Sequence, residues 1–140
     1  MKFRFSSSVD IKASPAEVWA LAVKLEEWPE WTSAIKRIER LSDGSLGVGS
    51  RLRVLARSLI TVQLIMTITE FVPEKRLYMK GRVLGMEMTR WYTLEQVDGR
   101  TRLTAGGEVS GLLAPLVRRG GQRLSEDIVR DARKRVESLK

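Results

Sequence analysis

Residues 111–140 read GLLAPLVRRGGQRLSEDIVRDARKRVESLK, and they carry a helical pattern of unusual length. Apolar side chains recur on one side of the predicted helix, at positions 113, 116, 117, 124, 128, 132, 136 and 139. Pro115 would lie in the first turn, where a proline is tolerated. Gly120 and Gly121 are expected to weaken the helix midway and could kink it. An amphipathic helix of this length needs an apolar surface to cover its apolar side.

Most of the chain before this helix predicts antiparallel β-strands. Apolar and polar residues alternate between turn-forming segments, which places strands at 2–12, 35–42, 50–57, 60–71, 75–82, 85–97 and 100–109. The segment 97–100, VDGR, is typical of a tight hairpin turn. A sheet and a long helix that are each apolar on one side bury those sides against each other. The expected fold class is therefore α+β, with a curved antiparallel sheet of six to seven strands wrapped around the C-terminal helix.

Two short helices are expected after the first strand. Ser14 is a predicted N-cap, Pro15 occupies the first helical position and Glu17 completes a capping box. Pro29 could open a second helix but could not lie inside the first one. The first helix is therefore expected to end near residue 26 or 27, and the second to run from about residue 29 to about residue 33.

Composition limits the chemistry that is open to this chain. It has 140 residues, the usual size of one domain, so residues 1–140 are expected to form a single domain. It contains neither cysteine nor histidine, which excludes disulfides, thiolate or imidazole metal sites and histidine-based catalysis. We expect no cofactor and no metal. The N-terminus lacks a signal-peptide pattern and no apolar run approaches about 20 residues, so a cytoplasmic protein without a transmembrane helix is expected.

The net charge of +8 allows two interpretations. Basic residues are scattered, and the densest groups are Arg51, Arg53 and Arg57, and then Arg118, Arg119 and Arg123. They can form a solvated surface or attract an anionic partner, such as an anionic membrane in weak contact. Nucleic acid is not an expected partner, because the basic strand positions lack interleaved aromatic platforms. The sequence leaves open whether the protein is a monomer or a homodimer.

Four segments, taken in order, resemble one known family. They are ASPAEVWALA (13–22) followed by EEWPEW (26–31), LGVGSRLRV (46–54), ITEFVPEKRLYMKG (68–81) and RWYTLEQVDGRTRLTAGGEVSG (90–111). Together they resemble the SRPBCC or START-like superfamily, and most closely its polyketide cyclase/dehydrase-like members. The resemblance implies the helix-grip fold and a deep, mostly apolar cavity between sheet and helix that holds a small hydrophobic molecule. It implies no reaction, since one fold hosts many functions.

The predicted strand 85–97 carries a charge on its apolar face. The residues that we place inward on this strand are Met86, Met88, Arg90, Tyr92 and Leu94. A buried Arg90 would be costly without a carboxylate, an anionic ligand group or water beside it. In the functional interpretation, Arg90 anchors a ligand carboxylate or polarises a carbonyl with help from Tyr92. In the alternative, Arg90 pairs with an internal acid such as Glu70 or reaches solvent.

The resemblance and the strand register together predict the lining of this cavity. The residues placed on it are Trp31, Ile35, Val54, Leu64, Met66, Met79, Met88, Arg90, Tyr92, Gly107, Val109, Leu113, Leu116, Val117 and Leu124. Methionines recur on adjacent strands, where they adapt to irregular ligands but also fill ordinary cores. Gly106 and Gly107 are expected to leave cavity volume or to mark a bulge.

Two of the four tryptophans, Trp28 and Trp31, flank Pro29 and Glu30. They lie three residues apart and are expected to face similar directions. We expect one of them to pack as core under the long helix, and Trp31 to line an end of the cavity with Ile35. The alternative is that both are core residues.

Three functions remain open at this point. The first is binding of a small hydrophobic molecule that is lipid- or polyketide-like. The second is a polyketide cyclase/dehydrase-type reaction that runs by positioning and proton transfer, with Arg90, Tyr92 and Glu70 as candidate catalytic residues. The third is an interaction or membrane-associated module without a ligand. The serines have no evident activating base, so nucleophilic catalysis finds no support.

Overall fold

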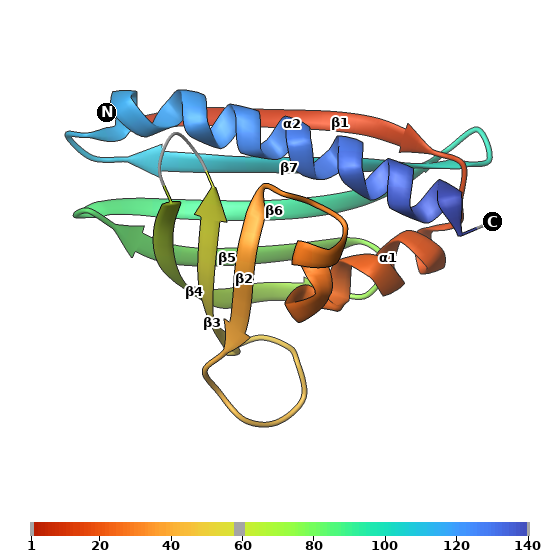
Figure 1. Cartoon of the computed structure of the whole chain (residues 1–140), viewed down its shortest axis with the longest axis horizontal. Coiled ribbons are helices and arrows are strands. Elements are labelled where there is room, and N and C mark those ends of the chain that lie inside the picture. Colours follow the sequence, from red (N-terminus) through yellow and green to blue (C-terminus); the bar gives the residue numbers. More distant parts are fainter. Residues whose placement is uncertain (1, 58–60, 140) are drawn as a thin grey trace.

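The computed structural model describes residues 2–57 and 61–139, and its elements follow the predicted order (Figure 1). The strands are β1 (Lys2–Ile11), β2 (Ile35–Arg40), β3 (Arg51–Arg57), β4 (Thr61–Val72), β5 (Arg76–Val83), β6 (Met86–Val97) and β7 (Arg100–Ser110). The helices are α1 (Pro15–Val23), the 3₁₀-helix η1 (Leu25–Glu30) and α2 (Ala114–Ser138). Residue 60, at the start of one predicted strand, lies outside the described residues. No helix within the described ranges is long and apolar enough to cross a membrane.

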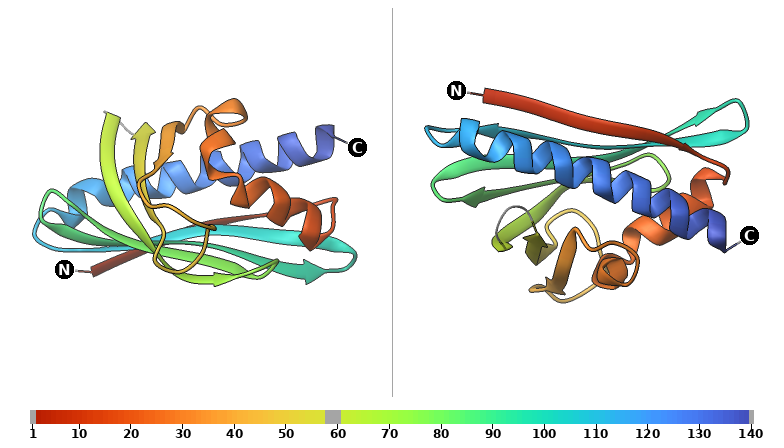
Figure 2. Two further views of the ribbon diagram at one scale, coloured as in Figure 1. Left: turned by 90° about the horizontal axis from the view of Figure 1, so that it is seen from below. Right: turned by 45° about the horizontal axis from the view of Figure 1, so that its top comes forward.

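The seven strands form one antiparallel sheet in the order β1-β7-β6-β5-β4-β3-β2. Figure 1 shows β1, β7, β6 and β5 running lengthwise while β2 and β3 cross them, and β4 bends from one direction into the other, so the sheet is strongly curved. α2 lies inside this curve and contacts β1 and β7. Figure 2 shows α1 beside the C-terminal half of α2, where the two helices are in contact. The predicted α+β architecture, a curved sheet that grips a long helix, is confirmed.

Two-residue turns close the last two hairpins. Asp98 and Gly99 link β6 to β7 with φ of 49° and 76°, as the VDGR sequence predicts. Leu84 and Gly85 link β5 to β6 in the same way, with φ of 51° and 77°. A leucine rarely adopts a positive φ. This turn holds the Leu84 side chain in solvent at one end of the sheet.

The start of α1 matches the capping box that the sequence predicts. The Ser14 hydroxyl accepts a hydrogen bond from the Glu17 backbone N–H, and the Glu17 carboxylate accepts one from the Ser14 backbone N–H. Pro15 opens the helix, where its missing N–H costs no hydrogen bond.

The end of α1 differs from the prediction. α1 ends at Val23 and η1 already occupies residues 25–30, so Pro29 lies within the second helix instead of opening it. The Trp28 indole N–H donates a hydrogen bond of 3.1 Å to the Ala22 carbonyl. That carbonyl is one of the acceptors that the end of a helix leaves unpaired. This bond ties η1 back to the end of α1, and only Lys24 separates the two helices.

α2 continues without interruption through Gly120 and Gly121, so the two glycines do not break it. The Phe5 ring of β1 packs so closely against Gly121 that a Cβ atom there would clash with it. The glycine therefore allows α2 to approach β1 closely.

Aromatic rings fill the space beside the two glycines of β7. A Cβ at Gly107 would clash with the Phe5 ring, and a Cβ at Gly106 would clash with the Trp91 indole. The register of β7 with both neighbouring strands continues unchanged through these residues. The two glycines thus neither mark a bulge nor leave open cavity volume, which corrects both expectations.

β4 contains a bulge that decides where its acidic residue points. Ile68 pairs with Met79, but Glu70 pairs with the next residue of β5, Tyr78. One residue of β4 is therefore extra, and the alternation of faces shifts by one position. Strict alternation would have put Glu70 on the same inner face as Ile68. The bulge instead places Glu70 on the outer face of the sheet.

Candidate functional site

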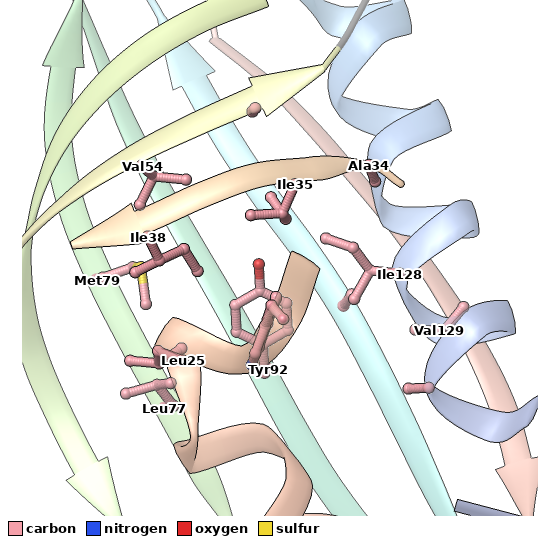
Figure 3. Close-up of a cluster of buried hydrophobic side chains, with 14 of the residues drawn as sticks. Leu25, Ala34, Ile35, Ile38, Val54, Leu77, Met79, Tyr92, Ile128 and Val129 are labelled. Atoms are coloured by element: carbon pink, nitrogen blue, oxygen red, sulfur yellow. The ribbon is translucent and has the colours of Figure 1, made fainter. Parts of the chain in front are cut away.

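A cavity of about 380 Å³ lies between α2, η1 and the concave face of the sheet. Figure 3 shows Ile35, Ile38, Val54 and Tyr92 converging from β2, β3 and β6. The full lining consists of Phe5, Leu25, Trp28, Ile35, Ile38, Leu52, Val54, Ala56, Val62, Leu64, Met66, Met79, Val83, Leu84, Met88, Arg90, Tyr92, Leu116, Val117, Gly120, Gly121 and Leu124. Among these lining residues Arg90 alone is charged, so the wall is apolar with one cationic point.

Most of the residues predicted to line a cavity do lie on its wall. They are Ile35, Val54, Leu64, Met66, Met79, Met88, Arg90, Tyr92, Leu116, Val117 and Leu124. The inward face predicted for β6 is correct, because Met86, Arg90, Tyr92 and Leu94 are all buried. Binding of a ligand by any of them stays a prediction.

Trp28, and not Trp31, lines the cavity. Trp28 is only 2% exposed and meets the Tyr92 ring edge-on, with centroids 5.1 Å apart. Trp31 packs on Trp28 with ring centroids 5.1 Å apart and faces a void of only about 10 Å³ beside Ile128 and Ala132. The prediction for Trp31 was wrong because η1 begins at residue 25, which turns Trp28 inward.

Three other predicted lining residues lie away from the cavity. Gly107 is covered by the Phe5 ring, which itself forms part of the wall. Val109 is completely buried in the hydrophobic core. Leu113 immediately precedes α2 and is 43% exposed. Each of these residues is apolar, as predicted, but none of them lies on the cavity wall.

Several wall residues were missed, and some of them had a signal in the sequence. Leu52, Ala56 and Val62 share a strand face with the predicted Val54 or Leu64, so alternation alone would have found them. Ile38 reaches the wall together with Ile35 because β2 has a register shift between residues 35 and 37. The remaining wall residues reach the cavity through contacts between segments that are distant in sequence, and no local pattern predicts such contacts.

Arg90 is buried and is held by neutral groups. It is 4% exposed, and its guanidinium donates hydrogen bonds to the Ser125 hydroxyl at 2.9 Å and to the Tyr92 hydroxyl at 3.3 Å. Its Cζ also lies 5.7 Å from the Phe5 ring centroid and 5.5 Å from that of Tyr92. None of the ion pairs formed within residues 2–57 and 61–139 includes Arg90.

Both expected partners of Arg90 are therefore absent from its surroundings. Glu70 forms an ion pair with Arg76 on the outer face of the sheet, and its side chain is 41% exposed. It cannot neutralise Arg90 or transfer a proton in the cavity. Solvent does not cover Arg90 either, given its burial. Hydroxyl dipoles and aromatic rings are the groups that stabilise the Arg90 charge within an apolar wall.

Ser125 is a polar residue of the site that the sequence analysis missed. It is completely buried in α2, and its hydroxyl donates a hydrogen bond of 2.8 Å to the Gly121 carbonyl. The sequence does indicate that Ser125 faces the core, because it lies three residues before Ile128 on the apolar side of the helix. A serine in such a place signals a buried hydrogen-bond partner.

The cavity opens between the β5–β6 turn and the N-terminal half of α2. Leu84 and Leu116 both line it, yet they are 71% and 74% exposed. Arg118 and Arg119 lie on the same half of α2 and are also exposed. An apolar ligand would therefore pass two exposed leucines to reach the cavity wall.

Comparison with known proteins agrees with this architecture. Residues 2–140 match the family described as polyketide cyclase / dehydrase and lipid transport. No curated protein sequence matches. A START superfamily protein from Mycobacterium smegmatis has a TM-score of 0.81 at 17% identity, over 98% of this chain and 99% of that chain. The Zhui aromatase/cyclase from Streptomyces sp. R1128 has a TM-score of 0.82 at 12% identity, over 98% of this chain and 94% of that chain.

Structural likeness at such low sequence identity shows the fold alone. The family match supports a stronger conclusion, because it spans nearly all of the sequence. The resemblance to START-like proteins is thereby confirmed, and the chain belongs to the polyketide cyclase/dehydrase and lipid transport family.

Proposed function

We propose that this protein binds a small hydrophobic molecule, lipid- or polyketide-like, in the cavity between the sheet and α2. The observation that carries the proposal is the apolar cavity of about 380 Å³, which lies within the size range of small-molecule sites. Packed cores rarely contain spaces much larger than a water molecule, so a cavity of this size is suited to holding a ligand. Met66, Met79 and Met88 on its wall suit an irregular apolar ligand, because methionine adapts its shape.

Native mass spectrometry and a cavity-filling variant test this proposal. A co-purified apolar molecule, or a thermal shift with apolar compounds, is the expected result. Val54→Trp places a large ring on the wall and should weaken binding by about tenfold or more. Leu55→Trp is the matched control, because Leu55 is on the opposite face of the same strand. Equal binding by the two variants, or no binding by the unmodified protein, would contradict the proposal.

A cyclase-type reaction is the second candidate, and Arg90 beside Tyr92 in the cavity favours it. A guanidinium can polarise a substrate carbonyl, and a confined apolar wall can fold a flexible chain. Glu70 no longer contributes, so the Tyr92 hydroxyl or bound water would have to move the proton. Tyr92→Phe should then abolish turnover of a polyketide substrate while ligand binding persists. Unchanged turnover in this variant would remove Tyr92 from the reaction.

Weak contact with an anionic membrane would suit a lipid-like ligand. Leu84 and Leu116 at the opening are exposed, and the same half of α2 carries the exposed Arg118 and Arg119; exposed apolar and basic side chains together suit an anionic lipid surface. Flotation with vesicles that contain anionic lipid should recover the protein, and Leu116→Glu should reduce the recovery. Equal recovery with neutral vesicles would argue against an electrostatic contact.

A further inference from the structure

Arg90 is a buried cation with no counter-ion within the described part of the chain. Its two hydrogen bonds go to the neutral hydroxyls of Ser125 and Tyr92 and use two of the five N–H groups of a guanidinium. Aromatic rings of Phe5 and Tyr92 lie beside it but carry no net charge. Three N–H groups thus have no protein partner among residues 2–57 and 61–139.

An unpaired charge in an apolar core is among the costliest arrangements in a protein. Hydroxyl dipoles and ring faces offset part of this cost. The remaining side of Arg90 faces the cavity, whose described lining contains no aspartate or glutamate. A negative charge for Arg90 can therefore come only from the contents of the cavity.

We propose that the ligand is an amphiphilic anion, with one carboxylate bound by Arg90 and an apolar body that fills the rest of the cavity. The proposal rests on the proposed binding function and names the chemical class of its ligand. A carboxylate suits this position because its two oxygens match the planar fork of a guanidinium. A neutral hydrocarbon would fill the same space but leave the Arg90 charge unpaired.

The structure also orients this ligand. Arg90 lies midway along the cavity side of β6 and is tied to α2 through Ser125. The walls formed by β3 and β4 are apolar, with Leu52, Val54 and Leu64 on them. The carboxylate would therefore lie against α2 and β6, and the apolar body would extend toward β3 and β4.

Surface charge supports the passage of an anion into this cavity. The net charge is +8, and Arg118, Arg119 and Arg123 are exposed on the half of α2 that borders the opening. A positive surface raises the local concentration of anions and speeds their association. Such an attraction acts at long range and weakens with salt, whereas contact with buried Arg90 does not depend on it.

Pairs of compounds that differ only in charge test the proposal. Decanoic acid and decanamide, and 2-naphthoic acid and 2-naphthamide, have the same shapes and are compared by calorimetric titration at a pH of about 7.5, where carboxylic acids are ionised. The acid should bind at least about tenfold more tightly than its amide, because hydrogen bonds between charged groups are the stronger ones. The preference should persist in high salt.

Substitution of Arg90 should remove this preference and leave apolar binding in place. Arg90→Met is expected to bind the acid and the amide about equally. Arg76→Met is the matched control, since it removes the same charge from the outer face of the sheet, and it should keep the preference. Circular dichroism confirms folding, and if Arg90→Met does not fold, the acid–amide comparison in the unmodified protein at low and high salt decides.

Each outcome separates the two proposals. Equal affinity for acid and amide in the unmodified protein would overturn the anionic ligand and leave binding of a hydrophobic molecule intact. A preference that survives Arg90→Met, or that vanishes in high salt, would assign it to the surface charge and overturn the role of Arg90. Failure of all four compounds to bind would count against the binding function itself.

Discussion

The Arg90 guanidinium donates a hydrogen bond of 2.9 Å to the Ser125 hydroxyl, and this bond joins β6 to α2 through the core. Ser125 in turn donates to the Gly121 carbonyl, which fixes the direction of its lone pairs. The pair therefore connects the charge in the cavity wall to the helix that covers it. Its loss would affect both stability and the orientation of Arg90.

Ser125→Ala should lower the free energy of unfolding by about 1–3 kcal/mol. The substitution removes a buried acceptor from a charged donor, and a donor left without a partner costs about that much. Urea denaturation measures the change. Ser138→Ala is the control, because that hydroxyl also bonds to a helix carbonyl but is exposed, and it should change stability by less than about 0.5 kcal/mol. Similar values for the two variants would show that the Arg90 contact contributes little.

Trp28 should report ligand binding by fluorescence, and Trp31 should not. Trp28 lines the cavity, whereas Trp31 is not on its wall and packs on Trp28 beside Ile128 and Ala132. Trp28→Phe is expected to abolish the change in emission on addition of an apolar ligand, and Trp31→Phe to keep it. If instead Trp31→Phe removed the signal, the cavity would extend past η1.

Gly107→Ala should destabilise the protein by about 1–3 kcal/mol through a clash with the Phe5 ring. The same ring also rests on Gly121, so it has little room to move aside. A double-mutant cycle with Phe5→Leu measures the coupling, and the smaller side chain should recover most of the loss. Additive effects would mean that the cost arises from the backbone and not from Phe5.

Glu70→Gln should leave ligand affinity unchanged within about twofold, in contrast to substitutions at Arg90. The Glu70 carboxylate is paired with Arg76 on the outer face of the sheet, with both side chains more than 40% exposed, at 41% and 44%. An exposed pair of this kind contributes at most about 1 kcal/mol to stability. Titration with an apolar ligand checks the prediction, and a large loss of affinity would place Glu70 nearer to the cavity than the bulge in β4 allows.

Two of the errors in predicting the site arise from an irregularity in a single element. Glu70 was considered as an internal acid, which strict alternation along β4 would allow, but one extra residue in β4 places it on the outer face. Trp31 was expected on the cavity wall with the second helix starting at residue 29, whereas η1 starts at residue 25 and Trp28 lines the wall. In both cases the local pattern was read correctly up to a single irregularity. Period-based reasoning carries such an offset through every residue that follows.

Local sequence by itself determined the elements of this protein and the faces they bury. The capping box at Ser14, the VDGR hairpin, the alternation along β6 and the amphipathic pattern of α2 each depend on neighbours in the chain. The order of these elements was enough to predict the fold, because a half-apolar sheet and a half-apolar helix must cover each other.

Only the tertiary structure decided which residues line the cavity and how they meet. The Phe5 ring lies in the wall because Gly107 and Gly121, distant in sequence, leave room for it from two sides. Arg90 meets Ser125 and no acid, since the bulge in β4 turns Glu70 outward. Contacts of this kind join residues tens of positions apart, so no local periodicity encodes them. These contacts between distant residues shape the apolar cavity and place a single positive charge on its wall.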